Sequence, residues 1–323
     1  MRPTARLIFN PVAGQGDPEQ ELSLIQSMLG EAFELETTLT TPEVGADVLA
    51  QEAVAHGLGA VFVSGGDGTV SAAAAAVMGT TTPLGVIARG TANAFANALA
   101  IPTTIEAACE NILKQQTKLI DVARCNGLPM VLLAGIGFEA ETVQKANREA
   151  KNRFGILAYV LAGLRQLREL DHFEAEVETD DKIISFTASA LTVANVAPPT
   201  SILAQGPSGL PIDDGMLDLT IVAPANRTSA IAATYHLLQS ALSGNPAERD
   251  DIGYLRAKRF TINTNPPQKV VLDGEMIGTT PITVECVPEG LTVFMTDPEA
   301  DIPTEKLEGL PDLVIEEKHP VGS

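Results

Sequence analysis

Apolar and polar residues follow two different patterns along the 323-residue chain, and the change falls near residue 118. Before it, apolar runs of strand length alternate with segments of three-four spacing. Because such alternation builds βαβ units, it predicts a parallel sheet covered by helices. The predicted strands are 7–10, 33–39, 60–63 and 84–88, and the predicted helices are 18–29, 43–55, 70–77, 92–99 and 105–115.

After residue 118, period-two and continuous apolar runs dominate, and Pro and Gly separate them. They predict a mostly antiparallel β-sandwich, interrupted by helices at 143–164 and 227–243. The predicted strands are 119–126, 130–133, 173–179, 183–196, 217–222, 254–264, 269–273, 282–287 and 291–295. We therefore predict a two-domain α+β protein: an α/β domain over 1–125, a β-sandwich domain over 126–297, and an acidic tail over 298–323. The tail is expected to be partly disordered or to pack back on the first domain.

Charge and cysteine usage narrow the function classes. The chain has 21 basic and 41 acidic residues, a net charge of −20. This argues against nucleic acid as a partner and against a purely electrostatic hold on an anionic membrane. The three cysteines are far apart and show no zinc spacing, which favours reduced thiols and a cytoplasmic protein. The longest apolar stretches reach about half a membrane span.

A glycine-rich turn, Ser64 to Thr69, reads Ser-Gly-Gly-Asp-Gly-Thr and joins the apolar run 60–63 to the alanine-rich run 71–77. Glycines let a backbone approach a phosphate, and the helix start that follows offers free N–H groups. Thr69 is predicted to cap that helix. A carboxylate beside a phosphate is repulsive without a cation, so Asp67 favours a Mg²⁺-nucleotide site.

Two further loops follow strands in the same way. The first is Asn-Pro-Val-Ala-Gly-Gln-Gly at 10–16, and the other is Arg-Gly-Thr-Ala-Asn at 89–93. In a parallel sheet all three loops lie at one edge, where ligands bind. Thr91 or Asn93 is expected either to cap the next helix or to touch the ligand. Alone, each loop is an ordinary turn or cap, and together they favour a site.

Carboxylates in the second half have two readings each. Leu-Asp-Gly-Glu at 272–275 is either a hairpin turn or the source of a general base, and the carboxylates at 213–218 form either a solvated turn or a cation site. No P-loop motif occurs, and no G-x-G-x-x-G follows a strand. These absences exclude a P-loop ATPase and weaken a dinucleotide dehydrogenase.

Four motifs in this order and spacing are similar to those of the bacterial soluble diacylglycerol kinase and lipid kinase family, whose relatives include sphingosine kinases. They are NPVAGQG, SGGDGTV, PLGVIARGTANAFANAL and LDGE, and the resemblance runs from about residue 4 to 297. It implies a phosphofructokinase-like α/β nucleotide domain, a β-sandwich lipid domain and a cleft between them. It also implies ATP- and Mg²⁺-dependent transfer of the γ-phosphoryl group to the hydroxyl of a lipid such as diacylglycerol, as in phospholipid biosynthesis.

The resemblance carries roles over to individual residues. Asp273 and Glu275 match the catalytic carboxylates, and which of them takes the proton stays open. Magnesium would be held by the carboxylate of Asp214 and the main-chain oxygens of Pro211 and Met216. The expected nucleotide-binding residues are Asn10, Pro11, Val12, Ala13, Gly14, Thr41, Gly65, Gly66, Asp67, Gly68, Thr69, Val70, Ser71, Thr91 and Asn93.

The chain departs from the family pattern within one motif. The family's usual acid and base are replaced by Ala94 and Asn97, and its usual proline by Ala88, which Arg89 follows. One alternative is therefore an impaired kinase that senses lipid or nucleotide; another is an NAD kinase-like enzyme, although no Asn-Glu pair occurs.

The expected partners are ATP, a lipid alcohol and, transiently, a membrane surface. The membrane would be contacted through apolar side chains or through a basic group formed by Lys145, Arg148, Lys151 and Arg153. A homodimer is compatible with the resemblance, but no residue pattern requires one. The protein is expected to be cytoplasmic and at times peripherally membrane-associated.

Overall fold

The computed structural model describes residues 2–137, 172–197, 211–224, 249, 251–296 and 305–318. The chain divides into two compact units, residues 1–122 with 288–299 and residues 123–287 with 300–323. The helices predicted at 143–164 and 227–243 lie outside the described residues, as does the basic group at 145–153.

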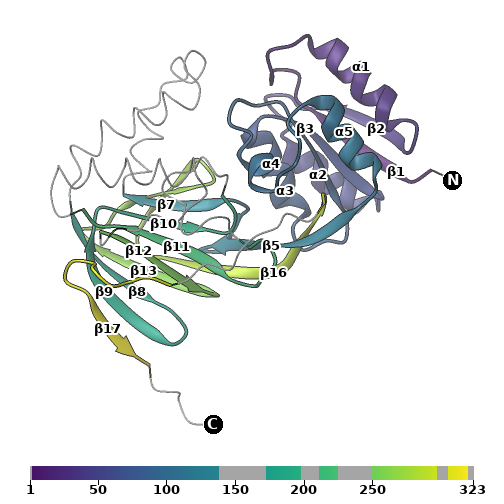
Figure 1. Cartoon of the computed structure of the whole chain (residues 1–323). Coiled ribbons are helices and arrows are strands. Elements are labelled where there is room, and N and C mark those ends of the chain that lie inside the picture. Colours follow the sequence, from purple (N-terminus) through teal and green to yellow (C-terminus); the bar gives the residue numbers. More distant parts are fainter. Residues whose placement is uncertain are drawn as a thin grey trace. The chain divides into compact units, whose positions relative to one another are not determined.

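The first unit is a parallel sheet with helices packed against it (Figure 1). Strand order is β4-β3-β1-β2, and all three pairings are parallel. Its elements are β1 (Thr4–Phe9), α1 (Pro18–Leu29), β2 (Glu34–Leu39), α2 (Ala46–Ala55), β3 (Ala60–Gly65), α3 (Asp67–Val77), β4 (Leu84–Ala88), α4 (Ala94–Ala98) and α5 (Ile105–Leu113). The parallel α/β fold predicted from the alternating pattern is confirmed.

Burial explains why these strands read as continuous apolar runs. Every residue of β3 and β4 is buried, as expected for strands covered on both faces. The core includes Phe9, Phe62 and Ile112 from three different elements. Helix α1 begins where Asp17 accepts hydrogen bonds from the N–H groups of the first turn.

The second unit is an antiparallel β-sandwich. One of its sheets has the order β12-β11-β10-β7-β14-β15, and the other runs β17-β9-β8-β13-β16. Its strands are β6 (Leu128–Met130), β7 (Leu133–Gly137), β8 (Phe173–Glu178), β9 (Lys182–Ala188), β10 (Ala190–Ala194), β11 (Leu217–Val222), β12 (Ile252–Ala257), β13 (Arg259–Asn265), β14 (Lys269–Leu272), β15 (Glu275–Thr279) and β17 (Val314–Glu317). Buried residues of both sheets, among them Ile136, Leu219, Val177 and Phe260, form one core. The predicted sandwich is thus confirmed.

Two strands carry the chain from one unit into the other: β5 (Thr117–Cys125) and β16 (Ile282–Phe294). The first part of β16 pairs with β13, and its last part pairs with β4 through Val293 and Leu84. Residues 288–296, which lie within the predicted second domain of 126–297, therefore cluster with the first unit.

The predicted tail contains structure that its composition hides. Strand β17 pairs with β9, and Leu310 is buried against Gly253. The described part of the tail thus packs on the second unit and not on the first domain, which was one of the two expectations. The acidic sequence of the tail does not predict strand β17, because this strand is stabilised by pairing with the backbone of β9.

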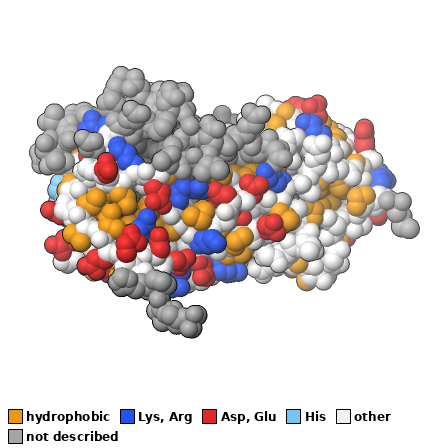
Figure 2. Space-filling view, turned by 60° about the horizontal axis from the view of Figure 1, so that its bottom comes forward, with side chains coloured by type: hydrophobic (Ala, Val, Ile, Leu, Met, Phe, Trp, Pro, Cys, Tyr) orange, Lys and Arg blue, Asp and Glu red, His pale blue; other side chains and the backbone are white. Residues whose placement is uncertain are grey.

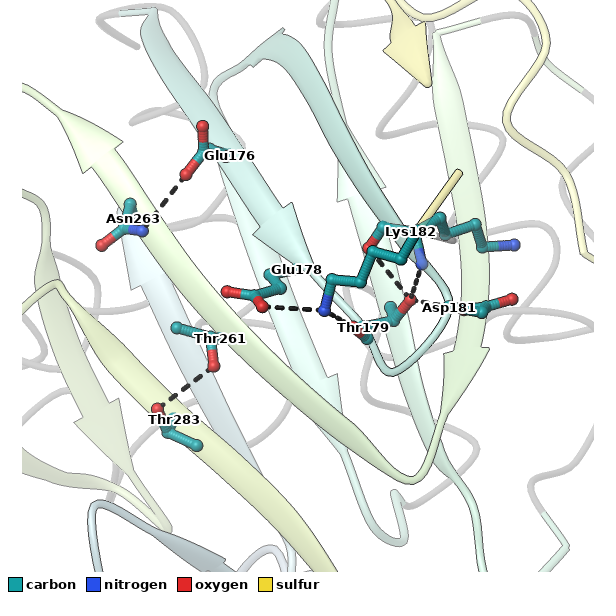
Figure 3. A network of polar contacts seen from close by, with 9 residues as sticks. Glu176, Glu178, Thr179, Asp181, Lys182, Thr261, Asn263 and Thr283 are labelled. Atoms are coloured by element: carbon teal, nitrogen blue, oxygen red, sulfur yellow. Dashed lines mark hydrogen bonds and ion pairs between the residues drawn. The ribbon is translucent and has the colours of Figure 1, made fainter. Parts of the chain in front are cut away.

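The outer face of the sheet β17-β9-β8-β13-β16 is polar (Figure 3). Along β8 buried and exposed residues alternate, so Glu176 points outward and accepts a hydrogen bond from Asn263 at 3.4 Å. The hydroxyls of Thr261 and Thr283 lie 3.3 Å apart on neighbouring strands. A groove of about 500 Å³ on this face is lined by Glu174, Glu176, Asn263 and Asp312 among others, and by none of the predicted site residues. Two of its carboxylates, those of Glu174 and Glu176, bind asparagines of β13, as expected of a structural face.

Candidate functional site

The three predicted loops lie together at one edge of the first unit. They follow β1, β3 and β4, which are adjacent parallel strands. The backbone N–H of Asn10 donates to the carbonyl of Ser64 at 2.8 Å, and that of Arg89 donates to Gly65 at 2.7 Å. The parallel topology therefore brings loops 10–16, 64–69 and 89–93 into contact, as their positions after strands predict.

The glycine turn opens directly into helix α3. Gly66 is the N-cap residue and no side chain caps the helix, so its first N–H groups are not used by a capping side chain. The expected cap, Thr69, already lies inside the helix, and its hydroxyl instead accepts a hydrogen bond from Asn10 Nδ2 at 2.8 Å. A helix start of this kind attracts an anion through its N–H groups and dipole.

Asp67 links the second loop to the third. Its carboxylate accepts hydrogen bonds from the backbone N–H groups of Asn93, at 3.2 Å, and Ala94, and so caps α4. Asn93 has a left-handed backbone with φ of 48°, and its side chain accepts from the N–H of Gly90 at 2.7 Å. Each Asp67 oxygen therefore accepts a hydrogen bond from a backbone amide of the third loop.

The remaining nucleotide-site predictions fall at the same edge. Thr40, at the end of β2, donates its N–H to the carbonyl of Phe9 at 3.0 Å. This places Thr41 beside the first loop, where its hydroxyl accepts from the N–H groups of Glu43 and Val44. Several residues expected to meet the ligand are exposed, namely Val12, Gly14, Gly68 and Thr91, while Pro11, Ala13 and Ser71 are half-buried and Val70 is buried.

Arg89 is held in the first unit by contacts that sequence reasoning missed. Its Nε donates to Glu21 Oε2 at 2.7 Å, its Nη1 to the carbonyl of Asn10 at 3.0 Å and its Nη2 to the carbonyl of Ala13 at 2.7 Å. Its Cζ lies 4.2 Å from the centroid of the Phe9 ring. The available signal was a charged residue directly after a buried strand, because a buried charge requires partners.

Asp273 lies in the second unit, in the turn between β14 and β15. Its carboxylate accepts three hydrogen bonds, from Val131 N–H at 2.8 Å and from Leu132 and Leu133 N–H at 2.9 Å each. Burial raises the pKa of Asp273, and these three donors oppose that rise. The carboxylate therefore fixes the start of β7 in addition to any chemical role.

Glu275 is the second carboxylate of this turn and is exposed. Its charge adds to the rise in the pKa of Asp273. Asp273 and Gly274 both have positive φ, 47° and 94°, which is the backbone of a tight hairpin. The hairpin reading of Leu-Asp-Gly-Glu is thus correct for the backbone, and it leaves room for chemistry by the side chains.

Asp214, the predicted magnesium ligand, takes part in a charged cluster. One of its oxygens pairs with Arg256, and the other accepts the N–H of Met216 at 3.0 Å. Arg256 also donates to the fully buried Asp218 at 2.9 Å, and Tyr254 donates to Asp218 as well. Among the described residues no group of three or more His, Cys, Asp and Glu side chains could hold a metal ion.

Sequence reasoning missed the pairing of these carboxylates with Arg256, although a signal existed. Asp218 and Arg256 are charged residues inside the apolar runs 217–222 and 254–264, and they face each other in the register of β11 and β12. Burial raises the pKa of Asp218 to about 7, and Arg256 opposes that rise.

The chain thus combines a parallel α/β unit with an antiparallel β-sandwich. A model of the diacylglycerol kinase catalytic domain matches residues 4–125, and one of the YegS C-terminal NAD kinase beta sandwich-like domain matches residues 133–295. The chain therefore belongs to the diacylglycerol kinase catalytic domain family, with its YegS-type C-terminal domain.

Similar proteins agree with this assignment. An uncharacterized protein of Synechocystis sp. (strain ATCC 27184 / PCC 6803 / Kazusa) is 47% identical over 90% of this chain and 70% of its own length. A diacylglycerol kinase of Bacillus subtilis (strain 168) is 31% identical over 86% of this chain and 91% of its own. The crystal structure of a candidate diacylglycerol kinase from Bacillus anthracis str. Sterne matches with a TM-score of 0.75 and 28% identity, covering 91% and 97% of the two chains.

Proposed function

We propose that the protein is an ATP- and Mg²⁺-dependent lipid kinase that transfers the γ-phosphoryl group to the hydroxyl of a lipid such as diacylglycerol. The observation that supports this most is the edge of the first unit, where three interlocked loops surround the uncapped start of α3. Phosphoryl transfer depends mainly on positioning and charge neutralisation, and such an edge supplies the positioning.

In this proposal the loops of the first unit surround the phosphates of ATP, which bind the N–H groups at the uncapped start of α3. The contacting residues are those expected from the sequence: Asn10 to Gly14, Thr41, Gly65 to Ser71, Thr91 and Asn93. None of the three loops carries a lysine, and their single arginine, Arg89, is turned to partners within the protein. Magnesium therefore enters with the nucleotide and neutralises its phosphates.

The second unit supplies the proton acceptor for the lipid hydroxyl, from Asp273 or Glu275. Asp273 is tied to three amides, whereas Glu275 is exposed. A carboxylate that accepts the hydroxyl proton makes the alcohol oxygen a better nucleophile toward the γ-phosphorus. Single variants of the two residues assign the acceptor.

A second magnesium ion at Pro211, Asp214 and Met216 stays a prediction. As the residues are arranged they do not fit the ion, because the positive charge of Arg256 is already paired with the carboxylate of Asp214. Binding there requires Arg256 to turn away from Asp214. No catalytic step is assigned to this ion.

The lipid acceptor would be reached by transient contact with a membrane surface from the cytoplasm. No helix among the described residues has the length and apolarity needed to cross a bilayer. The proposed membrane association is peripheral and transient, because a net charge of −20 opposes lasting electrostatic binding to an anionic surface.

The test is ATP-dependent phosphorylation of a lipid panel in mixed micelles with Mg²⁺. The panel contains diacylglycerol, a sphingoid base and phosphatidylglycerol, and the wild type is compared with Glu275→Gln and Asp273→Asn. We expect one phosphorylated lipid from the wild type and a loss of orders of magnitude in the variant that lacks the proton acceptor. Tight ATP binding with no product from any lipid would reject the kinase in favour of a sensor.

A further inference from the structure

The guanidinium of Arg89 faces the inside of the first loop. Its side chain is 2% exposed, and its Nη2 lies 2.5 Å from Glu21 Oε2 on α1. It also donates to the carbonyls of Asn10 and Ala13, which belong to the loop itself. The donors of Arg89 are thus directed to a carboxylate and to the loop backbone.

We propose that Arg89 is a positioning residue that holds residues 10–14 in the shape that receives the nucleotide phosphates, and that it is not itself a phosphate ligand. The inference rests on the proposed function, since it assumes that this loop binds ATP. It goes further because it assigns Arg89, the single basic residue of the three loops, to the loop backbone and not to the ligand.

The geometry of the Arg89 guanidinium supports this role. A planar guanidinium satisfies Glu21 and two separate carbonyls at once, and it also packs on the ring of Phe9. The ammonium of lysine is a point charge on a flexible stem and does not reproduce that spread of donors. Arg89 therefore ties the end of β1, the loop and the first turns of α1 together.

The loop is also fitted closely to this side chain. Gly14 has φ of +88°, a conformation that favours glycine, and a Cβ added there would lie 3.2 Å from Arg89 Nη2. The N–H groups of Val12 and Ala13 turn back to Asn10, at 3.1 and 3.2 Å. Opening of the loop would release both N–H groups to solvent.

The experiment compares Arg89→Lys with the matched variant Arg6→Lys. Arg6 is also a buried arginine of the first unit, with a side chain 9% exposed and paired with Glu36 at 2.8 Å and Glu52 at 3.4 Å, but it lies within β1 away from the loops. The measurements are the Kd for Mg·ATP by calorimetry, the KM for ATP and kcat with lipid, and amide hydrogen exchange at residues 11–14.

Arg89→Lys is expected to raise Kd and KM for ATP about tenfold or more, because a small displacement of a binding loop is costly. The KM for lipid should stay unchanged, and exchange at Val12 and Ala13 should rise. Arg6→Lys should change none of these at equal helix content. Wild-type values in Arg89→Lys, or equal effects in both variants, would overturn the inference.

Two outcomes keep this inference separate from the proposed function. If the wild type binds no Mg·ATP, the proposed function fails, while hydrogen exchange still shows whether Arg89 holds the loop. If Arg89→Lys does not fold, Glu21→Gln replaces it, since it removes the charge partner and keeps the arginine. A rise in loop exchange and a weaker ATP affinity in Glu21→Gln support the inference, and wild-type behaviour overturns it.

Discussion

Asp273 has a structural role beside the catalytic one that is proposed for it. Its place in Leu-Asp-Gly-Glu indicates a base, and its three amide partners show a structural function as well. A loss of activity in Asp273→Asn is therefore interpretable only beside a measurement of stability.

We expect Asp273→Asn to lower the free energy of unfolding by about 1–3 kcal/mol. An asparagine presents an NH₂ group where N–H donors converge, and this leaves at least one buried donor unsatisfied. Urea denaturation measures the change. The control is Glu275→Gln, which alters an exposed side chain of the same turn and should stay within about 0.5 kcal/mol. Equal stability of the two variants would contradict the structural role.

The buried thiols give a second prediction at the residue scale. Burial raises the pKa of Cys109 to about 12 and that of Cys125 to about 11, with smaller contributions from Glu106 and Asp273. Since the thiolate is the nucleophile, the native protein at pH 8 should react with a disulfide reagent only at the half-buried Cys286. Three thiols should react after unfolding; fast reaction of all three in the native state would contradict this burial.

The same shifts set the sign of a pH effect. Unfolded thiols ionise near pH 9.0, while the two native thiols ionise near 11 and 12. Between these values the unfolded chain binds fewer protons, so these groups lower the free energy of unfolding as pH rises. A flat stability difference between wild type and Cys109→Ala from pH 8 to 11 would argue against the shift of Cys109.

At the scale of elements, the sequence predicts those helices and strands whose ends are determined by nearby residues. Helix α1 has the predicted bounds because Asp17 and Pro18 mark its start. Strand β4 has the predicted bounds because Pro83 precedes its apolar run and Arg89 follows it. Helix α3 begins three residues before its predicted start, since Gly66 and not Thr69 is the cap. Strands β15 and β17 were not predicted, because exposed strands of mixed composition are stabilised by pairing with a neighbour.

The described tail should contribute to the stability of the second unit. Leu310 is 5% exposed, and a Cβ added to Gly253 would lie 2.8 Å from its Cδ1. Leu310→Ala is therefore expected to lower the free energy of unfolding by about 2–5 kcal/mol. Val314→Ala, at a side chain 52% exposed, should stay within about 0.5 kcal/mol. A change under 0.5 kcal/mol for Leu310→Ala in urea denaturation would show that the tail does not pack here.

At the scale of the whole molecule, the net charge bears on the proposed membrane contact. The face in Figure 2 carries acidic side chains mixed with basic ones and with apolar patches, and the net charge is −20. We expect co-sedimentation with vesicles to fall as anionic lipid is added, and added salt to weaken this effect. Stronger binding to anionic vesicles at low salt would instead favour the basic group at 145–153.

The site itself was predictable only in outline. Loops after parallel strands must share one edge, so the positions of Asn10, Gly66 and Arg89 indicate a common site. The bonds that interlock those loops join residues 24 to 79 positions apart, and no local pattern specifies them. For the same reason the sequence does not reveal that the guanidinium of Arg256 pairs with both Asp214 and Asp218.

The most direct test of the central claim is transfer of label from γ-³²P-ATP to lipid by the wild-type protein with Mg²⁺. Diacylglycerol is the first acceptor, and the matched blanks omit either lipid or Mg²⁺. The lipid-kinase proposal predicts label in a phosphorylated lipid, lost in both blanks. Label that remains in ATP across the whole lipid panel, with protein that binds Mg·ATP, would contradict it.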